Sequence, residues 1–329
     1  MSFPVLIPEA EFGIRSLCQA ARLIEQIRRE AGVSSLTKMD RSPVTVADFA
    51  VQALVAYHLA KEFSRDPLVA EENSSIFKTS EGAKILETVT HFVKQFIPEA
   101  RAGSVAEWVD RGTADPSDRF WVMDPIDGTK GFLRGEQYAI ALALIEKGKV
   151  KVGLLACPNL KDARSPEIGG EGTLAVAVRG QGGWHTSLKQ PKGFRPLRVS
   201  RRQKSSEAVF LSSVESRHTD RDRVERVMNK LEAHTQPIAM DSLAKYVLLA
   251  SGGADILLRL PSAPQPQHRE CIWDHAPGAI IVEEAGGKIS DFEGNAVDDS
   301  TGRILTVSRG ILVTNARLHA AALEALKEI

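Results

Sequence analysis

The sequence predicts an α/β protein, with an α+β first half over residues 1–158 and an α/β second half over residues 159–329. Several long segments have apolar residues at helical spacing, and short apolar runs of strand length stop abruptly at polar turns. Beyond the polar stretch Lys161–Gly172 the pattern changes to short strands that alternate with helices, which is typical of α/β proteins. The length of 329 residues fits one large domain or two closely packed halves.

The first half is expected to contain three helices. The second of them should start just after Ser42-Pro43, because Thr45 and Asp48 have the spacing of a capping box. Pro98 should close the third helix, since proline cannot continue a helix. The expected helices are Glu9–Ala31, Val46–Phe63 and Gly82–Ile97.

Four strands are expected in the same half, each a short apolar run. The turn Lys147-Gly148-Lys149 should join the last two. The segment Arg101–Asp118 holds glycine, proline and polar residues, and it predicts a loop between strands. The expected strands are Leu68–Ala70, Phe120–Met123, Ala139–Glu146 and Val150–Cys157.

In the second half, short strands should alternate with helices. Gly252-Gly253 and Gly286-Gly287 lie where helix C-caps belong. The expected strands are Thr173–Val178, Leu197–Val199 and Val209–Ser212. The expected helices are Asp220–Glu232, Ser242–Ser251, His275–Ala285 and Ala316–Lys327.

The composition argues against several classes of protein. The 42 lysine and arginine residues balance 42 aspartate and glutamate residues, whereas general nucleic-acid binders carry a basic surplus. The 3 cysteines are scattered and too few for a disulfide framework or a zinc site. No run reaches the ~18–20 apolar residues that span a bilayer, and the first residues lack the pattern of a secretory signal. We therefore expect a cytoplasmic protein without nucleic-acid or membrane partners.

The strongest functional signal is the run DPIDGT (Asp124–Thr129), which directly follows an apolar strand. It is expected to bring two carboxylates and the carbonyl of Ile126 to the carboxyl end of that strand, where α/β sheets bind ligands. Such oxygen atoms suit hard divalent cations such as Mg²⁺, and the backbone N–H groups of Gly128 and Thr129 suit a phosphate. An Asp-Pro turn with an Asp-Gly tip would explain D-P-x-D alone equally well, but the six-residue run is more specific.

Three further acidic positions are candidates, and each has a simpler explanation. Glu71-Glu72 follows a short strand, but adjacent acids on a loop are most often solvated. Asp48 has the spacing of a helix-capping acid, a role that leaves its second oxygen available to a cleft. Asp274 lies in WDHAPG just before an apolar helix, where an N-cap aspartate is common. None of these positions is decisive alone.

Motifs of competing enzyme classes are missing from the sequence. The two aspartates of DPIDGT are three residues apart, whereas haloacid-dehalogenase-type phosphatases need a D-x-D spacing. The sequence has neither a Walker-type G-x-x-x-x-G-K-[ST] run nor a G-x-S-x-G elbow. The 8 histidines form no H-x-x-x-H pair, so an oxygen-bound metal is the better hypothesis.

Taken together, DPIDGT, Glu71-Glu72, TVAD (Thr45–Asp48) and WDHAPG (Trp273–Gly278) resemble the lithium-sensitive, magnesium-dependent phosphomonoesterases. This superfamily includes inositol monophosphatase and fructose-1,6-bisphosphatase. The resemblance implies a layered αβαβα sandwich. One departure is Ala70, where the superfamily usually has glycine.

Longer stretches resemble one branch of this superfamily, the 3′(2′),5′-bisphosphate nucleotidases. These stretches are Ser42–Asp48, Asp124–Leu160, Met240–Tyr246 and Leu258–Pro261. The resemblance implies an enzyme that removes the 3′-phosphate of adenosine 3′,5′-bisphosphate, giving AMP and phosphate, with 3′-phosphoadenylyl sulfate as a second substrate. Such an enzyme would serve sulfur metabolism, be inhibited by Li⁺ and need no obligate protein partner.

The resemblance also implies roles for individual residues around two to three Mg²⁺ ions. The first ion would be held by Glu71, Asp124 and the Ile126 carbonyl, and the second by Asp124, Asp127 and Asp274. A third, weaker ion would lie near Glu71 through water. Thr129, hydrogen-bonded to Asp48, would orient and deprotonate the attacking water, and the N–H groups of Gly128 and Thr129 would hold the phosphate. This agrees with the chemistry, because paired Mg²⁺ ions neutralise a phosphomonoester and lower the pKa of water.

By the same resemblance, the nucleotide would be contacted by Ser242, Lys245 and Arg259, with His218 near the base or ribose. A different interpretation is that Lys245 and Arg259 are surface charges. Two other functions stay open at this point. One is a phosphatase of inositol phosphates from the same superfamily, and the other is a nucleotide-binding sensor without turnover.

Overall fold

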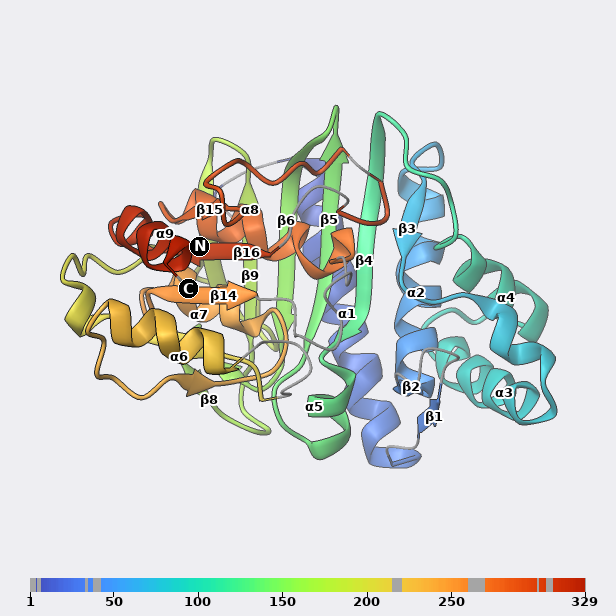
Figure 1. The fold of residues 1–329 in the computed structure, drawn as a ribbon. Helices are drawn as coiled ribbons and strands as arrows, with labels where there is room; N and C mark the ends of the chain where they lie inside the picture. The colour runs from blue at the N-terminus through green and yellow to red at the C-terminus, as the bar shows by residue number, and fades with distance from the viewer. Residues whose placement is uncertain are drawn as a thin grey trace.

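The computed structural model describes residues 4, 7–32, 35–37, 43–214, 221–259, 270–300, 302–305 and 310–328 (Figure 1). The helices are α1 (Pro8–Glu30), α2 (Val46–Glu62), α3 (Ser80–Lys94), α4 (Ala102–Asp110), α5 (Thr129–Arg134), α6 (Arg221–Lys230), α7 (Ala244–Ala250), α8 (Ala276–Glu284) and α9 (His319–Lys327), with short 3₁₀ turns η1 (Ser74–Lys78), η2 (Ser205–Glu207) and η3 (Ile272–Asp274). No helix of these described ranges is long and apolar enough to cross a membrane.

A mixed sheet of seven strands forms the centre of the molecule, in the order β11-β10-β9-β6-β5-β4-β3. Its neighbouring strands are antiparallel except β3 and β4, which run parallel. The strands are β3 (Leu68–Ala70), β4 (Arg119–Asp127), β5 (Ala139–Glu146), β6 (Lys149–Cys157), β9 (Thr173–Val178), β10 (Gly182–Ser187) and β11 (Arg195–Pro196). Two small ladders lie outside it, β1 (Ser35–Thr37) with β2 (Pro43–Thr45) and β7 (Leu160–Lys161) with β8 (Ser165–Pro166).

The two faces of this sheet carry side chains of different size, because successive residues of a strand point to opposite faces. Along β5, Ile140, Leu142 and Leu144 pack with α1 and α2 in one core, whereas the alanines between them belong to the core on the other face. On that second face, a Cβ added to Gly153 of β6 would lie 2.2 Å from Ile280 of α8. The small residues therefore let α8 approach the sheet closely.

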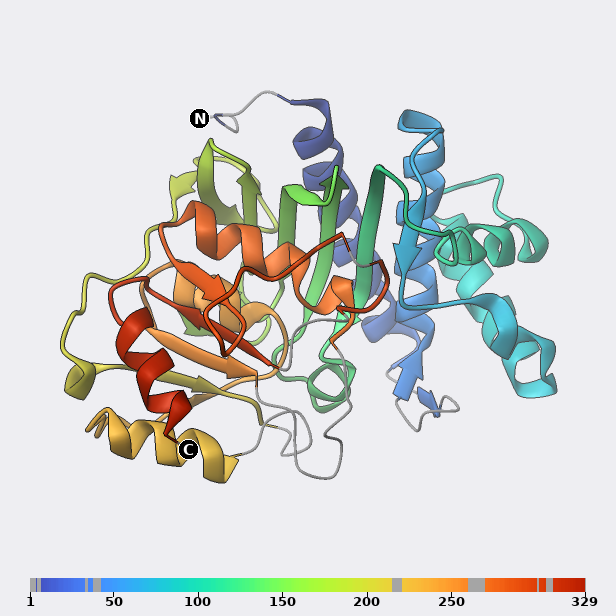
Figure 2. The ribbon, with the colours of Figure 1, turned by 45° about the horizontal axis from the view of Figure 1, so that its top comes forward.

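A second sheet of five strands lies beyond α7 and α8, in the order β13-β12-β14-β16-β15. Helices α6 and α9 lie on its outer face (Figure 2), and their apolar side chains share a core with those of the sheet. Its strands are β12 (Phe210–Ser212), β13 (Ile238–Ala239), β14 (Ile256–Arg259), β15 (Lys288–Ser290) and β16 (Ile311–Thr314). From α1 and α2 across to α6 and α9, the layers alternate as α, β, α, β and α, which confirms the expected sandwich.

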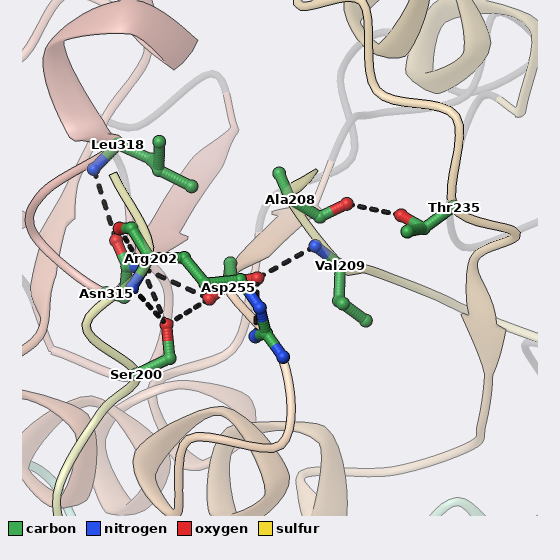
Figure 3. A network of polar contacts seen from close by, with 8 residues as sticks. All are labelled: Ser200, Arg202, Ala208, Val209, Thr235, Asp255, Asn315 and Leu318. Carbon is green, nitrogen blue, oxygen red and sulfur yellow. Dashed lines mark hydrogen bonds and ion pairs between the residues drawn. The ribbon is translucent and has the colours of Figure 1, made fainter. Parts of the chain in front are cut away.

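A buried aspartate fixes the chain where it enters the second sheet (Figure 3). Asp255, which is 0% exposed, accepts a hydrogen bond from the Val209 N–H at 2.8 Å and pairs with Arg202 at 3.0 Å. The Asn315 side chain donates to its other oxygen at 3.1 Å. Asp255 directly precedes β14, so these contacts anchor the strand whose far end carries Arg259.

Most expected elements are confirmed to within a few residues, but two expectations are wrong. The segment Arg101–Asp118, expected as a loop, contains helix α4, which buries Val105 and Val109 one turn apart. The expected strand Leu197–Val199 does not form; the strand there is the two-residue β11. The large sheet also continues beyond residue 158 through β9 to β11, so the division into halves at that residue does not follow a sheet boundary and stays a prediction.

Candidate metal and phosphate site

The ends of two adjacent parallel strands bring the first acids together. Ala70 of β3 lies opposite Met123 of β4, so Glu71 and Asp124 follow at neighbouring positions. Between Asp124 and Asp127 the register of β4 against β5 shifts. Residues three apart in a regular strand point to opposite faces, whereas a bulge of one residue returns them to the same face. The bulge therefore lets both aspartates of DPIDGT face one site.

The third member of the cluster comes from the other half of the chain. Asp274 ends η3, and one carboxylate oxygen from each of Asp124, Asp127 and Asp274 lies within 4.8 Å of the other two. The N-cap of α8 is His275, without a side-chain hydrogen bond, so the interpretation of Asp274 as a simple helix cap is wrong. The Asp274 carboxylate is instead turned toward the acids of β4.

Electrostatics supports the convergence of all five predicted acids. Burial raises the pKa of Asp124 well above its ordinary value, and neighbouring negative charges raise it further. Those charges belong to Glu71, Asp127, Asp274 and Asp48. Carboxylates held this closely repel one another unless protons or cations neutralise them. The donor set, all oxygen and strongly negative, fits a hard divalent cation such as Mg²⁺.

Asp48 has the expected capping role at the start of α2. Its Oδ2 accepts hydrogen bonds from the Thr45 N–H at 2.8 Å and from the Thr45 hydroxyl at 2.6 Å, and Asp48 is 0% exposed. The Thr129 hydroxyl donates to the Ile126 carbonyl at 3.1 Å. The expected hydrogen bond between Thr129 and Asp48 therefore stays a prediction, since Thr129 directs its proton to Ile126 in this structure.

Gly128 allows the tight turn between β4 and α5. Its φ of 84° lies in the left-handed region, which favours glycine. A Cβ added at this position would lie 2.9 Å from the Cβ of Ser242. Both the backbone angle and the close approach of Ser242 therefore require glycine here.

The expected nucleotide-binding segment of the second half contacts the same motif. Ser242 has a positive φ of 67°, and the next N–H, that of Leu243, donates to the Asp127 carboxylate. Lys245 is buried and donates to the Met240 carbonyl at 3.0 Å. Burial, with the nearby charge of Arg259, lowers the pKa of Lys245 to about 8.

Arg259 connects this segment to Asp274. It pairs with Glu270 through two hydrogen bonds, at 3.1 Å and 2.5 Å, and donates to the Asp274 carbonyl at 2.7 Å. The side chain of Arg259 is 20% exposed and Lys245 is 6% exposed. The interpretation of both as surface charges is therefore wrong. His218 lies outside the described residues.

Sequence reasoning missed Gln52, one helical turn after Asp48. Its amide donates to the Glu72 carbonyl and to the Val109 carbonyl, both at 2.7 Å, and accepts from the Glu72 N–H at 3.0 Å. These bonds fix the chain that carries Glu71. Glu72 is 4% exposed, so the interpretation of that residue as solvated is wrong. The available signal was one polar residue inside the apolar run of α2.

Fold and site together define a layered α/β protein with a carboxylate cluster, formed at a strand end and at η3, whose donor set fits divalent cations. The pattern of the inositol monophosphatase family matches residues 10–329. The chain belongs to the inositol monophosphatase family.

Similar proteins cover nearly the whole chain. The 3′(2′),5′-bisphosphate nucleotidase of Oryza sativa is 40% identical, over 95% of this chain and 92% of the relative. The 3′(2′),5′-bisphosphate nucleotidase of Schizosaccharomyces pombe is 36% identical, over 96% of this chain and 94% of the relative.

Among solved structures, the IMPase of Thermotoga maritima has a TM-score of 0.67 at 21% identity and 98% coverage of both chains. An IMPase/NADP phosphatase complexed with Mg²⁺ and phosphate has a TM-score of 0.61 at 20% identity, over 93% of this chain and 90% of that one. At this identity the solved structures establish the fold.

Proposed function

We propose that the chain is a Mg²⁺-dependent 3′(2′),5′-bisphosphate nucleotidase. It hydrolyses the 3′-phosphate of adenosine 3′,5′-bisphosphate to AMP and phosphate, and 3′-phosphoadenylyl sulfate to adenylyl sulfate and phosphate. One observation carries the proposal: next to the carboxylate cluster of Asp124, Asp127 and Asp274, the charges of the buried Lys245 and the half-buried Arg259 act on Asp127. Relatives at 36–40% identity bear this name.

The acids would hold the cations. We assign one ion to Glu71, Asp124 and the Ile126 carbonyl, a second to Asp124, Asp127 and Asp274, and a third, weaker ion to the neighbourhood of Glu71. When bound, Mg²⁺ supplies positive charge to the phosphoryl oxygens and lowers the pKa of water. The geometry supports this assignment, because one carboxylate oxygen from each of the three aspartates lies within 4.8 Å of the other two.

The remaining residues of DPIDGT would act on the phosphate and on the attacking water. The N–H groups of Gly128 and Thr129 hold phosphate oxygens. The Thr129 hydroxyl turns from the Ile126 carbonyl toward Asp48, takes a proton from the water and passes its own proton to Asp48. Asp48 is suited to this role because its other contacts, to Thr45, fix its carboxylate at the start of α2.

The substrate would be recognised by the second half. Lys245 is largely protonated at neutral pH, since its pKa of about 8 lies above 7. Together with Arg259 it gives a cationic site for the phosphate that is not cleaved. Ser242, adjacent to Gly128, and His218 complete the proposed contacts to the nucleotide.

A substrate comparison tests this proposal. With Mg²⁺ present, the purified protein is expected to release phosphate from adenosine 3′,5′-bisphosphate at least about tenfold faster than from inositol 1-phosphate. A hydrogen bond to a charged group contributes about 1.5–3 kcal/mol, and about 1.4 kcal/mol corresponds to a tenfold ratio. Li⁺ is expected to inhibit the release. The reverse ranking would favour the inositol phosphatase function, which the family membership also allows. Calorimetric binding of the nucleotide without any phosphate release would favour a sensor.

A further inference from the structure

Arg303 lies beside the chain that leads to Asp274. The Ile272 N–H donates to the Arg303 carbonyl at 3.0 Å, and the Leu305 N–H donates to the Glu270 carbonyl at 2.9 Å. Between these bonds, Cys271 and Ile304 form an antiparallel bridge. The backbone of Arg303 is therefore fixed against the segment that ends at Asp274.

The side chain of Arg303 reaches to the other half of the site. Its Nη2 donates to the Ala70 carbonyl at 2.7 Å and its Nη1 to the Gly112 carbonyl at 3.1 Å. The Gly112 carbonyl also accepts the Ala70 N–H at 2.8 Å. The Ala70 carbonyl belongs to the peptide group that joins Ala70 to Glu71. One guanidinium therefore fixes the peptide that leads to this proposed metal ligand.

The same guanidinium contacts the residue before Asp274. Its central carbon lies 5.1 Å from the centre of the Trp273 ring, a cation–π distance. Trp273 is 7% exposed. Arg303 thus touches the immediate chain neighbours of Glu71 and of Asp274, two acids about 200 positions apart in the sequence.

We propose that Arg303 is a positioning residue that holds Glu71 and Asp274 at the separation the metal centre needs; this inference rests on the proposed function. A planar guanidinium can bond two carbonyls and stack on a ring at the same time. A lysine ammonium is a point charge on a flexible stem, so it cannot keep all three contacts. The residues that orient metal ligands typically change metal affinity about 10–100-fold when they are replaced.

Mn²⁺ binding by the substrate-free protein tests this proposal. We expect Arg303→Lys and Arg303→Gln to weaken Mn²⁺ binding in calorimetry by about tenfold or more. The Mg²⁺ concentration for half-maximal phosphate release should rise similarly, whereas the nucleotide KM at saturating Mg²⁺ should stay within about twofold.

The matched control is Arg179→Lys. Arg179 also donates to a backbone carbonyl, that of Val150 at 3.1 Å, but it pairs with Glu283 and Glu284, which are not proposed metal ligands. This control should bind Mn²⁺ like the unaltered protein.

Unchanged Mn²⁺ affinity in a folded Arg303→Lys or Arg303→Gln protein would overturn the proposal. If the unfolding midpoint of that variant in chelator also falls, the role of Arg303 is purely structural. The two proposals fail in different ways. If the unaltered protein binds Mn²⁺ and the variants bind it weakly, but no nucleotide is hydrolysed, only the proposed function is contradicted. If the unaltered protein binds no Mn²⁺, both are contradicted.

Discussion

Replacing Asp127 with asparagine is expected to reduce phosphate release at least about 1,000-fold while the chain stays folded. Asparagine has almost the same shape, and its oxygen still accepts the Leu243 N–H that now bonds the Asp127 carboxylate. It removes one negative charge from the cluster with Asp124 and Asp274. A loss of about 4 kcal/mol in charge stabilisation of the transition state corresponds to a 1,000-fold slower reaction.

The same substitution is expected to stabilise the protein when divalent ions are absent. Burial raises the pKa of Asp127, so the folded chain holds the proton more tightly than the unfolded chain does. Ionisation at neutral pH therefore costs stability, and a neutral amide avoids that cost. The melting temperature in chelator should rise. Asp162→Asn is the matched control, because the Asp162 side chain is 59% exposed and pairs with Arg195. Near-normal turnover by Asp127→Asn would contradict the proposed role of Asp127 as a metal ligand.

Replacing Gly128 with alanine is expected to slow phosphate release about 100-fold or more and to destabilise the fold by roughly 1–2 kcal/mol. Alanine would have to keep a φ of 84°, and its Cβ would lie 2.9 Å from Ser242. Relieving this contact shifts the backbone N–H groups proposed to hold the phosphate and moves Ser242 on the nucleotide side. Turnover per folded molecule measures the slower phosphate release, and denaturant unfolding measures the loss of stability.

Gly180→Ala separates backbone strain from the effect on the site. Gly180 has a φ of 74° in the turn between β9 and β10, and a Cβ added there meets nothing within 4 Å. The control should therefore lose a similar amount of stability and keep its turnover. If Gly128→Ala kept the same turnover as Gly180→Ala, the assignment of Gly128 to phosphate binding would be wrong.

The local part of the structure is readable from the sequence. Helical spacing and the capping box predicted α2 and its start at Thr45, and the structure has both of the box's hydrogen bonds. The run DPIDGT indicated acids at a strand end, because its signal is contained in six consecutive residues. Helix α4 was missed because glycine and polar residues obscured two buried valines.

The rest of the site depends on contacts between distant segments. The bulge that turns Asp124 and Asp127 to one face is a matter of register between β4 and β5, which neither strand encodes alone. Gln52 and Arg303 donate hydrogen bonds to backbone carbonyls. Every residue type has such a carbonyl, so the sequence of the partner segment gives no sign of the contact. The burial of Lys245 follows from the packing of α7 between the two sheets.

Phosphate release from adenosine 3′,5′-bisphosphate after exhaustive removal of divalent ions tests the central claim most directly. Burial and the negative charges of four neighbouring acids raise the pKa of Asp124. Only bound cations make such a cluster useful for attack on a phosphate ester. We predict that chelated protein releases no phosphate above background and that added Mg²⁺ restores the full rate. Hydrolysis that continues undiminished in the chelated protein would contradict the account.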